Sequence, residues 1–372
     1  MLHAKINILL RRLYSWAMRH QLATVFVCFF LVTVIFAWEL LIPGRSLYRW
    51  DTLLYNWPIF LEVREQILSG NMPFWSSSFS CGVPLLASIS PGALYPIRIL
   101  SWFLPLRLGY HLFLFVHIWL SLVGMYLLLR RSMRLSIIAA FAGALVYGCS
   151  GYMRSMWDTH NFWIMPWIPL GFLALLEARN ASRWIWSLLG TTICWSMMIL
   201  CGDPQSALLW FPAGLLMVIL QPPESCAPSS RSWHNSVRLR LAVVLTGAVA
   251  ISLLITAPQW ITSFFAFTES YRLGEPQFLE AMERSFNPVR LVELFLPHVF
   301  GTHGQWFGTA LAGAGAMKTT PWTSSFHVGL LPLLAIWLAM RKRKRPLVKW
   351  SLIVLFVSLL LSFGRFIPGA NL

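Results

Sequence analysis

The sequence predicts an all-α, polytopic membrane protein that folds as one domain over residues 1–372. Its composition is 57% hydrophobic and only 11% charged, whereas about a quarter of the residues of a soluble domain are charged. Apolar segments long enough to cross a bilayer recur along the chain. Basic residues gather at alternate ends of these segments. Together, the three observations exclude a soluble protein.

The positions of the basic residues predict the topology, because cytosolic loops of membrane proteins collect Lys and Arg. Eighteen of the 29 basic residues, but only Glu177 and Glu224 of the 13 acidic residues, lie in five short segments: 1–20, 130–134, 177–183, 221–240 and 341–349. These segments carry the whole net charge of +16, and the remaining 11 basic residues are balanced by 11 acidic ones. The excess charge therefore indicates a cytosolic N-terminus, and we exclude nucleic acid as a partner.

The first predicted span follows a basic start and covers Leu22–Ile42, about 20 residues, which is enough to cross a hydrocarbon core of roughly 30 Å. No small-residue cleavage site follows it, so we expect an anchor and not a removed signal peptide. Eight further spans are expected at about 109–129, 135–152, 162–176, 184–201, 206–220, 241–257, 327–340 and 350–363. The shortest of these leave a re-entrant segment open as an alternative.

Two long connections, 43–108 and 258–326, are predicted on the extracytoplasmic side, together with two short ones around Asp158 and Asp203. The cytosolic connections are short, so chemistry is expected on the outer face. We expect Arg49–Pro96 to be a long non-helical stretch. Tryptophans crowd this side, among them Trp157 and Trp163; an interfacial belt is the simpler interpretation and sugar stacking the alternative.

Asp51 is the first candidate for chemistry, since it lies about eight residues beyond the first predicted span. A carboxylate in this position can act as a general base toward an acceptor hydroxyl. Arg45 and Arg49 flank Asp51 and favour its ionised form. A structural ion pair is therefore the alternative to a catalytic role.

Two short outer turns supply further candidates for substrate binding, namely Asp158 and His160 in one and Asp203 and Gln205 in the other. Acidic residues near a membrane are costly unless they are paired or hydrated, which makes them functional candidates. Asp203 stands directly before Pro204, and an N-cap followed by proline also commonly starts a helix. For Asp203 both interpretations stay open.

The second long connection contributes Gln259, Glu269 and Arg272 to the candidate substrate-binding residues. Arg272 and Arg154 lack a nearby acid in a fixed helical register, and the planar fork of either arginine suits a phosphate group. A surface salt bridge is the more common role of such residues.

The sequence indicates no metal or cofactor. His298 and His303 lie five residues apart, a spacing that defines no metal pair, and the six cysteines show no CxxC or other metal-ligand spacing. Cys81, Cys149 and Cys201 are all expected near the outer face, so one disulfide among them stays open.

A set of short landmarks, in order along the chain, resembles the bacterial YfhO-like membrane proteins of the GT-C glycosyltransferase group. They are Asp51, SGNMPFW (Ser69–Trp75), CGVPLLA (Cys81–Ala87), LYP (Leu94–Pro96), GCSGY (Gly148–Tyr152), His160, WIPL (Trp167–Leu170), GDPQ (Gly202–Gln205), PQW (Pro258–Trp260), ESYR (Glu269–Arg272), HVGLLPL (His327–Leu333) and SFGR (Ser362–Arg365). Each landmark alone is weak, but together they cover nearly the whole chain.

The resemblance implies a helical GT-C fold with about nine transmembrane helices in the bacterial cytoplasmic membrane. It implies an enzyme that takes a sugar from a polyprenyl-phosphate carrier and passes it to a glycan or lipid acceptor of the cell envelope. Asp51 matches the catalytic carboxylate, and Arg272 and Arg154 are the candidates for binding the leaving phosphate. No nucleotide-sugar site and no cofactor are expected.

The chain departs from the family pattern in three ways. Asn56 stands near the place of a usual Gln, and GDPQ replaces Gly-His-Pro-Gln. The chain also ends about eight residues after SFGR, which leaves a truncated product, a split gene or a minimal form as expectations. A transporter or flippase of lipid-linked glycan, or an inactive subunit, are the alternatives. Transporters carry ionisable residues at mid-membrane, whereas the acids here gather at the outer ends of the spans, which favours surface chemistry.

Overall fold

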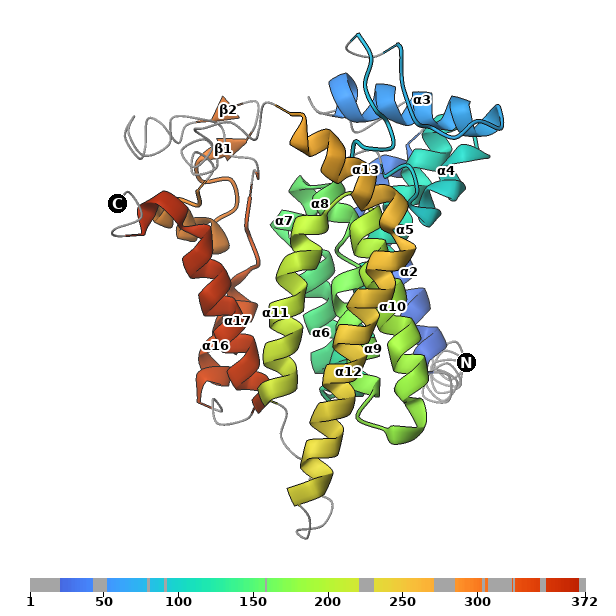
Figure 1. Cartoon of the computed structure of the whole chain (residues 1–372). Helices are drawn as coiled ribbons and strands as arrows, with labels where there is room; N and C mark the ends of the chain where they lie inside the picture. The colour runs from blue at the N-terminus through green and yellow to red at the C-terminus, as the bar shows by residue number, and fades with distance from the viewer. Residues whose placement is uncertain are drawn as a thin grey trace, which may run out of the picture.

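The computed structural model shows a bundle of upright helices with a layer of shorter elements across one end (Figure 1). It describes residues 21–42, 52–78, 81–89, 92–157, 159–220, 231–270, 285–302, 305–306, 323, 325–341 and 346–367. We call the end that carries α3, α8 and α13 the outer end, after the orientation that the basic residues predict.

The upright helices are α2 (Gln21–Phe36), α5 (Leu106–Leu127), α6 (Ile137–Gly148), α9 (Trp167–Glu177), α10 (Trp184–Leu200), α11 (Pro204–Leu220), α12 (Arg231–Ile255), α16 (Leu330–Met340) and α17 (Pro346–Ser362). The outer end carries η1 (Trp38–Leu41), η2 (Thr52–Asn56), α3 (Trp57–Leu68), η3 (Pro96–Arg98), α4 (Ile99–Trp102), α7 (Gly151–Ser155), α8 (His160–Trp163), α13 (Ala257–Thr268), η7 (Pro288–Leu294), β1 (Gly301–Thr302), β2 (Gln305–Trp306) and η8 (Gly364–Phe366). Two short turns, η4 (Leu128–Ser132) and η5 (Ala181–Arg183), lie at the opposite end.

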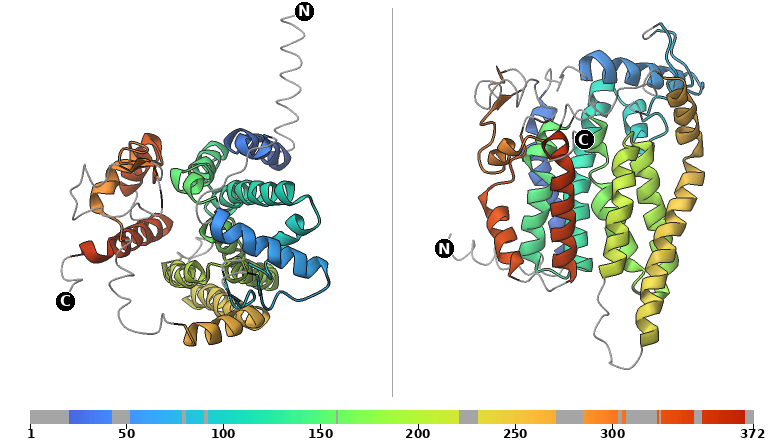
Figure 2. Two further views of the ribbon diagram at one scale, coloured as in Figure 1. Left: turned by 90° about the horizontal axis from the view of Figure 1, so that it is seen from above. Right: turned by 60° about the vertical axis from the view of Figure 1, so that its left-hand side comes forward.

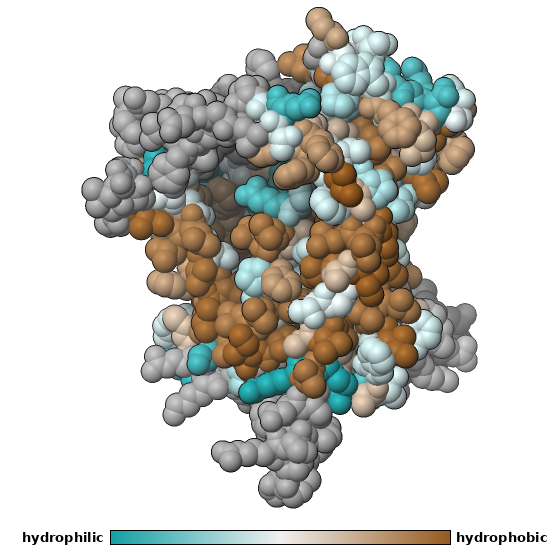
Figure 3. Space-filling model, viewed as in Figure 1, coloured by the Kyte–Doolittle hydropathy of each residue, from teal (hydrophilic) through white to brown (hydrophobic). Residues whose placement is uncertain are grey.

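The coarse prediction, a helical protein with segments able to cross a membrane, is confirmed. Within the part of the chain that the structure describes, three helical stretches are long and apolar enough to cross, namely Leu106–Ser132, Ile137–Ser155 and Val237–Ile255. A helix occupies each of the nine segments predicted as spans. Hydrophobic residues dominate the middle of the bundle, and hydrophilic ones lie toward its two ends (Figure 3). This distribution is expected of helices whose middle faces lipid.

The prediction that Arg49–Pro96 is non-helical is wrong, because α3 forms within it. This helix begins with proline in its first turn and buries Ile59, Phe60 and Val63, which are spaced three and four residues apart as one helical face requires. They pack against Leu85, Leu86 and Ala93 of the following loop. Seen from above, α3 lies across the end of the bundle (Figure 2).

A buried hydrogen-bonded chain fixes the turn before η3. Trp167 Nε1 donates to the Tyr95 hydroxyl at 2.7 Å, the hydroxyl lies 2.7 Å from His117 Nε2, and His117 Nδ1 lies 2.7 Å from the Phe113 carbonyl oxygen. Because a carbonyl oxygen only accepts, Nδ1 carries the hydrogen and Nε2 accepts from Tyr95. All the polar groups of this chain are satisfied, so the position of the residues after Tyr95 is well defined.

The C-terminal helices α16 and α17 stand beside the main bundle (Figure 2). Trp350 Nε1 donates to the Ala213 carbonyl at 2.9 Å and so joins α17 to α11. At the outer end the Phe286 amide donates to the Ser362 carbonyl at 2.8 Å. The second outer connection is therefore packed on the end of α17.

The five cysteines that the structure describes are all free, so the disulfide left open among Cys81, Cys149 and Cys201 does not form. Cys201 is buried at the end of α10, where its thiol donates to the Met198 carbonyl at 3.2 Å, whereas Cys81 is exposed in the outer loop. Cysteines that share one face in a topology scheme still need Cα atoms within about 7 Å to be joined.

Candidate functional site

Segments that are distant in the sequence meet at the outer end. The Gln259 side chain at the start of α13 donates through Nε2 to the Leu86 carbonyl, 173 residues earlier, at 2.6 Å. The Gly151 amide at the start of α7 donates to the His327 carbonyl at 2.8 Å. α13 is thus joined to the first outer connection, and the α6–α7 turn is joined to the segment before α16. We call these segments at the outer end, taken together, the outer layer.

Asp203 is a buried acid of this layer, and both of its carboxylate oxygens accept hydrogen bonds. Its exposed fraction is 4%. Oδ1 accepts from the Ser206 amide at 3.0 Å, and Oδ2 accepts from the Ser206 hydroxyl at 2.7 Å and from Asn161 Nδ2 at 3.0 Å. The first contact is an N-cap, so the capping interpretation of Asp203 is confirmed, and the contact to Asn161 also joins α11 to α8.

His160 lies next to Asp203 because Gly202 allows a close approach. Gly202 adopts φ of 99°, and a Cβ atom built on it would lie 3.3 Å from His160 Cβ and 2.8 Å from the Ile89 carbonyl oxygen. Burial lowers the pKa of His160, and the carboxylate of Asp203 opposes that shift. A neutral imidazole beside a buried carboxylate can accept a proton or a hydrogen bond from a substrate hydroxyl.

The stability of the protein is expected to fall as the pH drops below about 6.5, in part through His160. The unfolded histidine has a pKa near 6.5, and the folded pKa is lower, so the unfolded state binds the extra proton first. The contribution of neutral His160 to the free energy of unfolding is therefore fully present above about pH 6.5. Below that pH it is lost by at most about 1.4 kcal/mol per pH unit, the limit for one proton. Thermal unfolding in detergent at several pH values measures this slope.

The variant His160→Gln should show a shallower slope than the wild type, whereas Gln205→Ala, at an exposed residue that does not titrate, should not. A slope that His160→Gln leaves unchanged would show that other groups titrate.

Two substitutions separate the capping role of Asp203 from a role of its charge. Asp203→Ala removes the cap and leaves the Asn161 donor without its acceptor, which should lower the free energy of unfolding by about 1–3 kcal/mol. Asp203→Asn keeps the N-cap through its single amide oxygen, and its NH2 group can donate to Asn161 once that amide turns its oxygen inward, so it should cost less than about 1 kcal/mol. Unfolding in detergent measures both, with Gln205→Ala, an exposed residue of the same turn, as the control. Equal losses for Ala and Asn would refute the cap as the main contribution.

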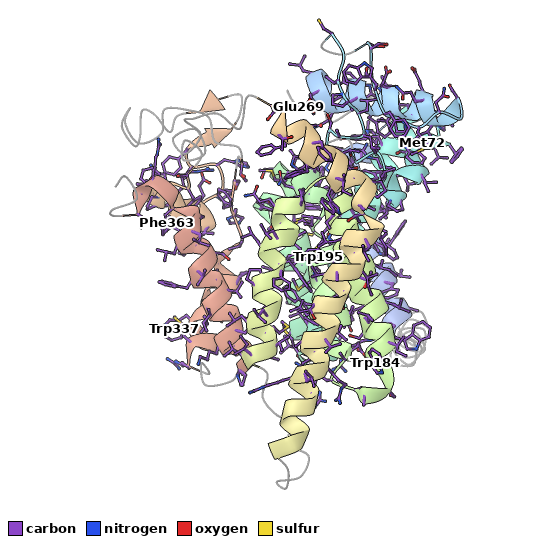
Figure 4. All side chains as sticks on the ribbon, viewed as in Figure 1. Met72, Trp184, Trp195, Glu269, Trp337 and Phe363 are labelled. Carbon is purple, nitrogen blue, oxygen red and sulfur yellow. The ribbon has the colours of Figure 1, made fainter. Side chains whose placement is uncertain are left out.

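Gln259 is buried, with an exposed fraction of 2%, whereas Gln205 and Glu269 are exposed. Gln259 Oε1 has no hydrogen-bond partner among the described residues. Glu269 lies at the end of α13 (Figure 4). The structure therefore places Gln259 in the buried part of the outer layer and leaves Gln205 and Glu269 at its surface.

The sequence suggested that Arg154 has no acidic partner, but in the structure it forms an ion pair. Its Nη2 lies 2.6 Å from Glu39 Oε2, and its guanidinium lies 4.2 Å from the ring centroid of Trp157. The acid comes from η1, 115 residues earlier, so no local register could reveal it. This is the salt-bridge alternative for Arg154. Asp51, Asp158 and Arg272 lie outside the described residues.

Arg98 and Asn161 were missed by the sequence analysis. Asn161 follows His160 directly, so its position in the same predicted outer turn could have identified it as a candidate site residue. Arg98 follows the LYP landmark by two residues and is buried, with an exposed fraction of 3%. Trp163, predicted as part of an interfacial belt, is buried too and packs on Arg98, as Trp157 packs on Arg154. These two tryptophans are thus core residues.

Within the described ranges, no three His, Cys, Asp or Glu side chains come together in a way that could hold a metal ion. Comparison of the chain with protein-family models, with curated proteins and with solved structures yields no match.

Proposed function

We propose that the chain is a membrane glycosyltransferase of the GT-C type. It moves a sugar from a polyprenyl-phosphate carrier to an acceptor of the cell envelope at the extracytoplasmic face of the bacterial cytoplasmic membrane. About nine transmembrane helices and two extracytoplasmic connections make up the proposed architecture, with the N-terminus in the cytosol.

One observation carries the proposal: several landmarks of the resemblance, which are scattered in the sequence, touch one another at the outer end. PQW contacts CGVPLLA through Gln259 and Leu86, and LYP contacts WIPL through Tyr95 and Trp167. A site that binds a lipid-linked donor and an envelope acceptor needs such a layer beside the apolar helices.

In the proposed reaction, Asp51 removes the proton from the acceptor hydroxyl while its oxygen attacks the anomeric carbon. The bond from that carbon to the carrier phosphate breaks, and the phosphate leaves with the electron pair, so no acid is needed to protonate it. His160, Asp203, Asn161 and Gln259 belong to the layer that would hold the sugars. Asp158 and Arg272 remain proposed members of the site from sequence alone.

Reconstitution of the purified protein in liposomes tests the proposal against the transporter alternative. A radiolabelled polyprenyl-phosphate sugar and envelope glycan or lipid acceptors are supplied, and two quantities are measured: label transferred to the acceptor, and labelled lipid moved between leaflets. Transfer above empty liposomes supports the enzyme. Movement between leaflets without transfer supports a flippase, and neither activity supports an inactive subunit.

A further inference from the structure

Arg98 is a buried cation surrounded by aromatic rings. Its guanidinium carbon lies 4.9 Å from the ring centroid of Phe60, 5.0 Å from that of Phe113 and 4.3 Å from that of Trp163. Burial lowers the pKa of Arg98 to about 10, so it is still charged at neutral pH. The ring faces attract the charge, but they accept no conventional N–H···O hydrogen bond.

The guanidinium has no acceptor of its own within the described chain. Arg98 Nε is buried without a hydrogen-bond partner, and no ion pair to a described carboxylate involves Arg98. The side chains of Tyr110, Tyr95 and Cys201 are its electrostatic neighbours, and none of them is a carboxylate. Arg290, the second arginine that is buried among the described residues, shows the usual arrangement, because it pairs with Glu293.

A second unpartnered donor lies beside Arg98. Trp163, whose ring packs on the guanidinium, has its own Nε1 buried without a partner. A buried charge that lacks a counter-ion costs several kcal/mol, and a buried donor without an acceptor adds to the cost. Groups that destabilise the folded protein in this way are typical of binding sites, where the missing partner is the ligand.

We propose that Arg98 and Trp163 form an anion site that binds a phosphate ester at the outer end of the bundle. The guanidinium fork suits the oxygen pairs of a phosphate, and the apolar helices directly below the site suit a phosphate carried on a lipid. For the lipid carrier the inference rests on the proposed function. Phe60 of α3 forms one wall of the aromatic cage, so access to Arg98 requires α3 to move.

Binding of unglycosylated polyprenyl phosphate to the full chain in detergent tests the site, with inorganic phosphate and neutral polyprenol as the other two probes. Affinity is read from the rise in melting temperature with ligand concentration and from quenching of tryptophan fluorescence. We expect polyprenyl phosphate to raise the melting temperature and polyprenol to have little effect. Inorganic phosphate that displaces the lipid would show that the phosphate group suffices, whereas phosphate that does not compete would show that the lipid tail is needed as well.

The variant Arg98→Met should weaken polyprenyl phosphate binding at least 10-fold, while the melting temperature of the free protein stays equal or rises, because a buried unpaired charge has been replaced by an apolar chain of similar length. Arg64→Met is the matched control. Arg64 lies in the same layer, but its Nε and Nη2 donate to the carbonyls of Trp102 and Leu104 at 2.9 and 3.3 Å. Its loss should lower the melting temperature and leave the affinity within about twofold.

Arg98→Lys keeps the charge without the fork and should bind with intermediate affinity, which keeps the test decisive if Arg98→Met does not fold. Affinity that neither variant changes, or equal binding of polyprenol and polyprenyl phosphate, would overturn the proposal. No sugar is transferred in this assay, so an anion site found in a protein without transferase activity would refute only the proposed function.

Discussion

Replacing Asp51 by asparagine is expected to lower the rate of sugar transfer roughly 10²- to 10⁴-fold, the range that a positioned general base contributes. The amide keeps the size of the side chain but cannot take the proton of the acceptor hydroxyl. In the proposed reaction Asp51 acts on the acceptor and not on the donor, so the loss should appear in the chemical step and not in donor binding. Transfer under single-turnover conditions, together with donor affinity, measures the two separately.

The matched control is Glu65→Gln, an exposed acid of α3 in the same outer connection. This substitution removes the same charge and should leave transfer within about twofold. If transfer by Asp51→Asn equals that of the wild type, Asp51 is not the base. A structural ion pair of Asp51 with Arg45 or Arg49 then becomes the favoured interpretation.

Replacing Glu293 by glutamine is expected to lower the free energy of unfolding by about 3–5 kcal/mol. Arg290 and Glu293 form a two-pronged ion pair, with Nη2–Oε2 at 2.7 Å and Nε–Oε1 at 3.1 Å, and their side-chain exposures are only 6% and 0%. Nη2 also donates to the Thr323 carbonyl at 2.7 Å, so this pair joins two parts of the second outer connection. The variant removes the negative charge that lies against the buried guanidinium of Arg290.

A surface pair of the same length provides the control. Arg183 and Glu177 also meet at 2.7 Å, but their exposures are 59% and 29%, so Glu177→Gln should cost no more than about 1 kcal/mol. The double substitution Arg290→Met with Glu293→Leu should recover most of the loss, because no buried charge remains. Thermal unfolding in detergent compares all three. Equal costs for the two single variants would show that burial does not decide the strength of the pair.

The apolar segments predicted where the upright helices form, because a run of about 15–20 apolar residues in lipid has few alternatives to a helix. α3 was not predicted. Its polar residues, such as Glu62 and Glu65, interrupt the apolar ones at the spacing of a surface helix. Such a segment is not a continuous apolar run, so it does not resemble a membrane span.

The partners of the candidate site residues were less accessible from sequence. For Asp203 the local pattern before Pro204 offered the cap as one of two open interpretations, because a capping bond spans only three residues. The contact to Asn161 and the pairing of Arg154 with Glu39 span 42 and 115 residues. No periodicity of the chain encodes such distances.

By itself, the sequence determined the helical class, the segments able to cross a membrane and the turn at Asp203, because these depend on composition and on contacts within one helical turn. Only the tertiary structure decided which polar groups are paired and which are not. It paired Arg154 with Glu39, enclosed Arg98 among three aromatic rings from three different segments, and joined Gln259 to Leu86. The physical reason is that the pairing and burial of a side chain depend on the packing of segments far apart in the chain.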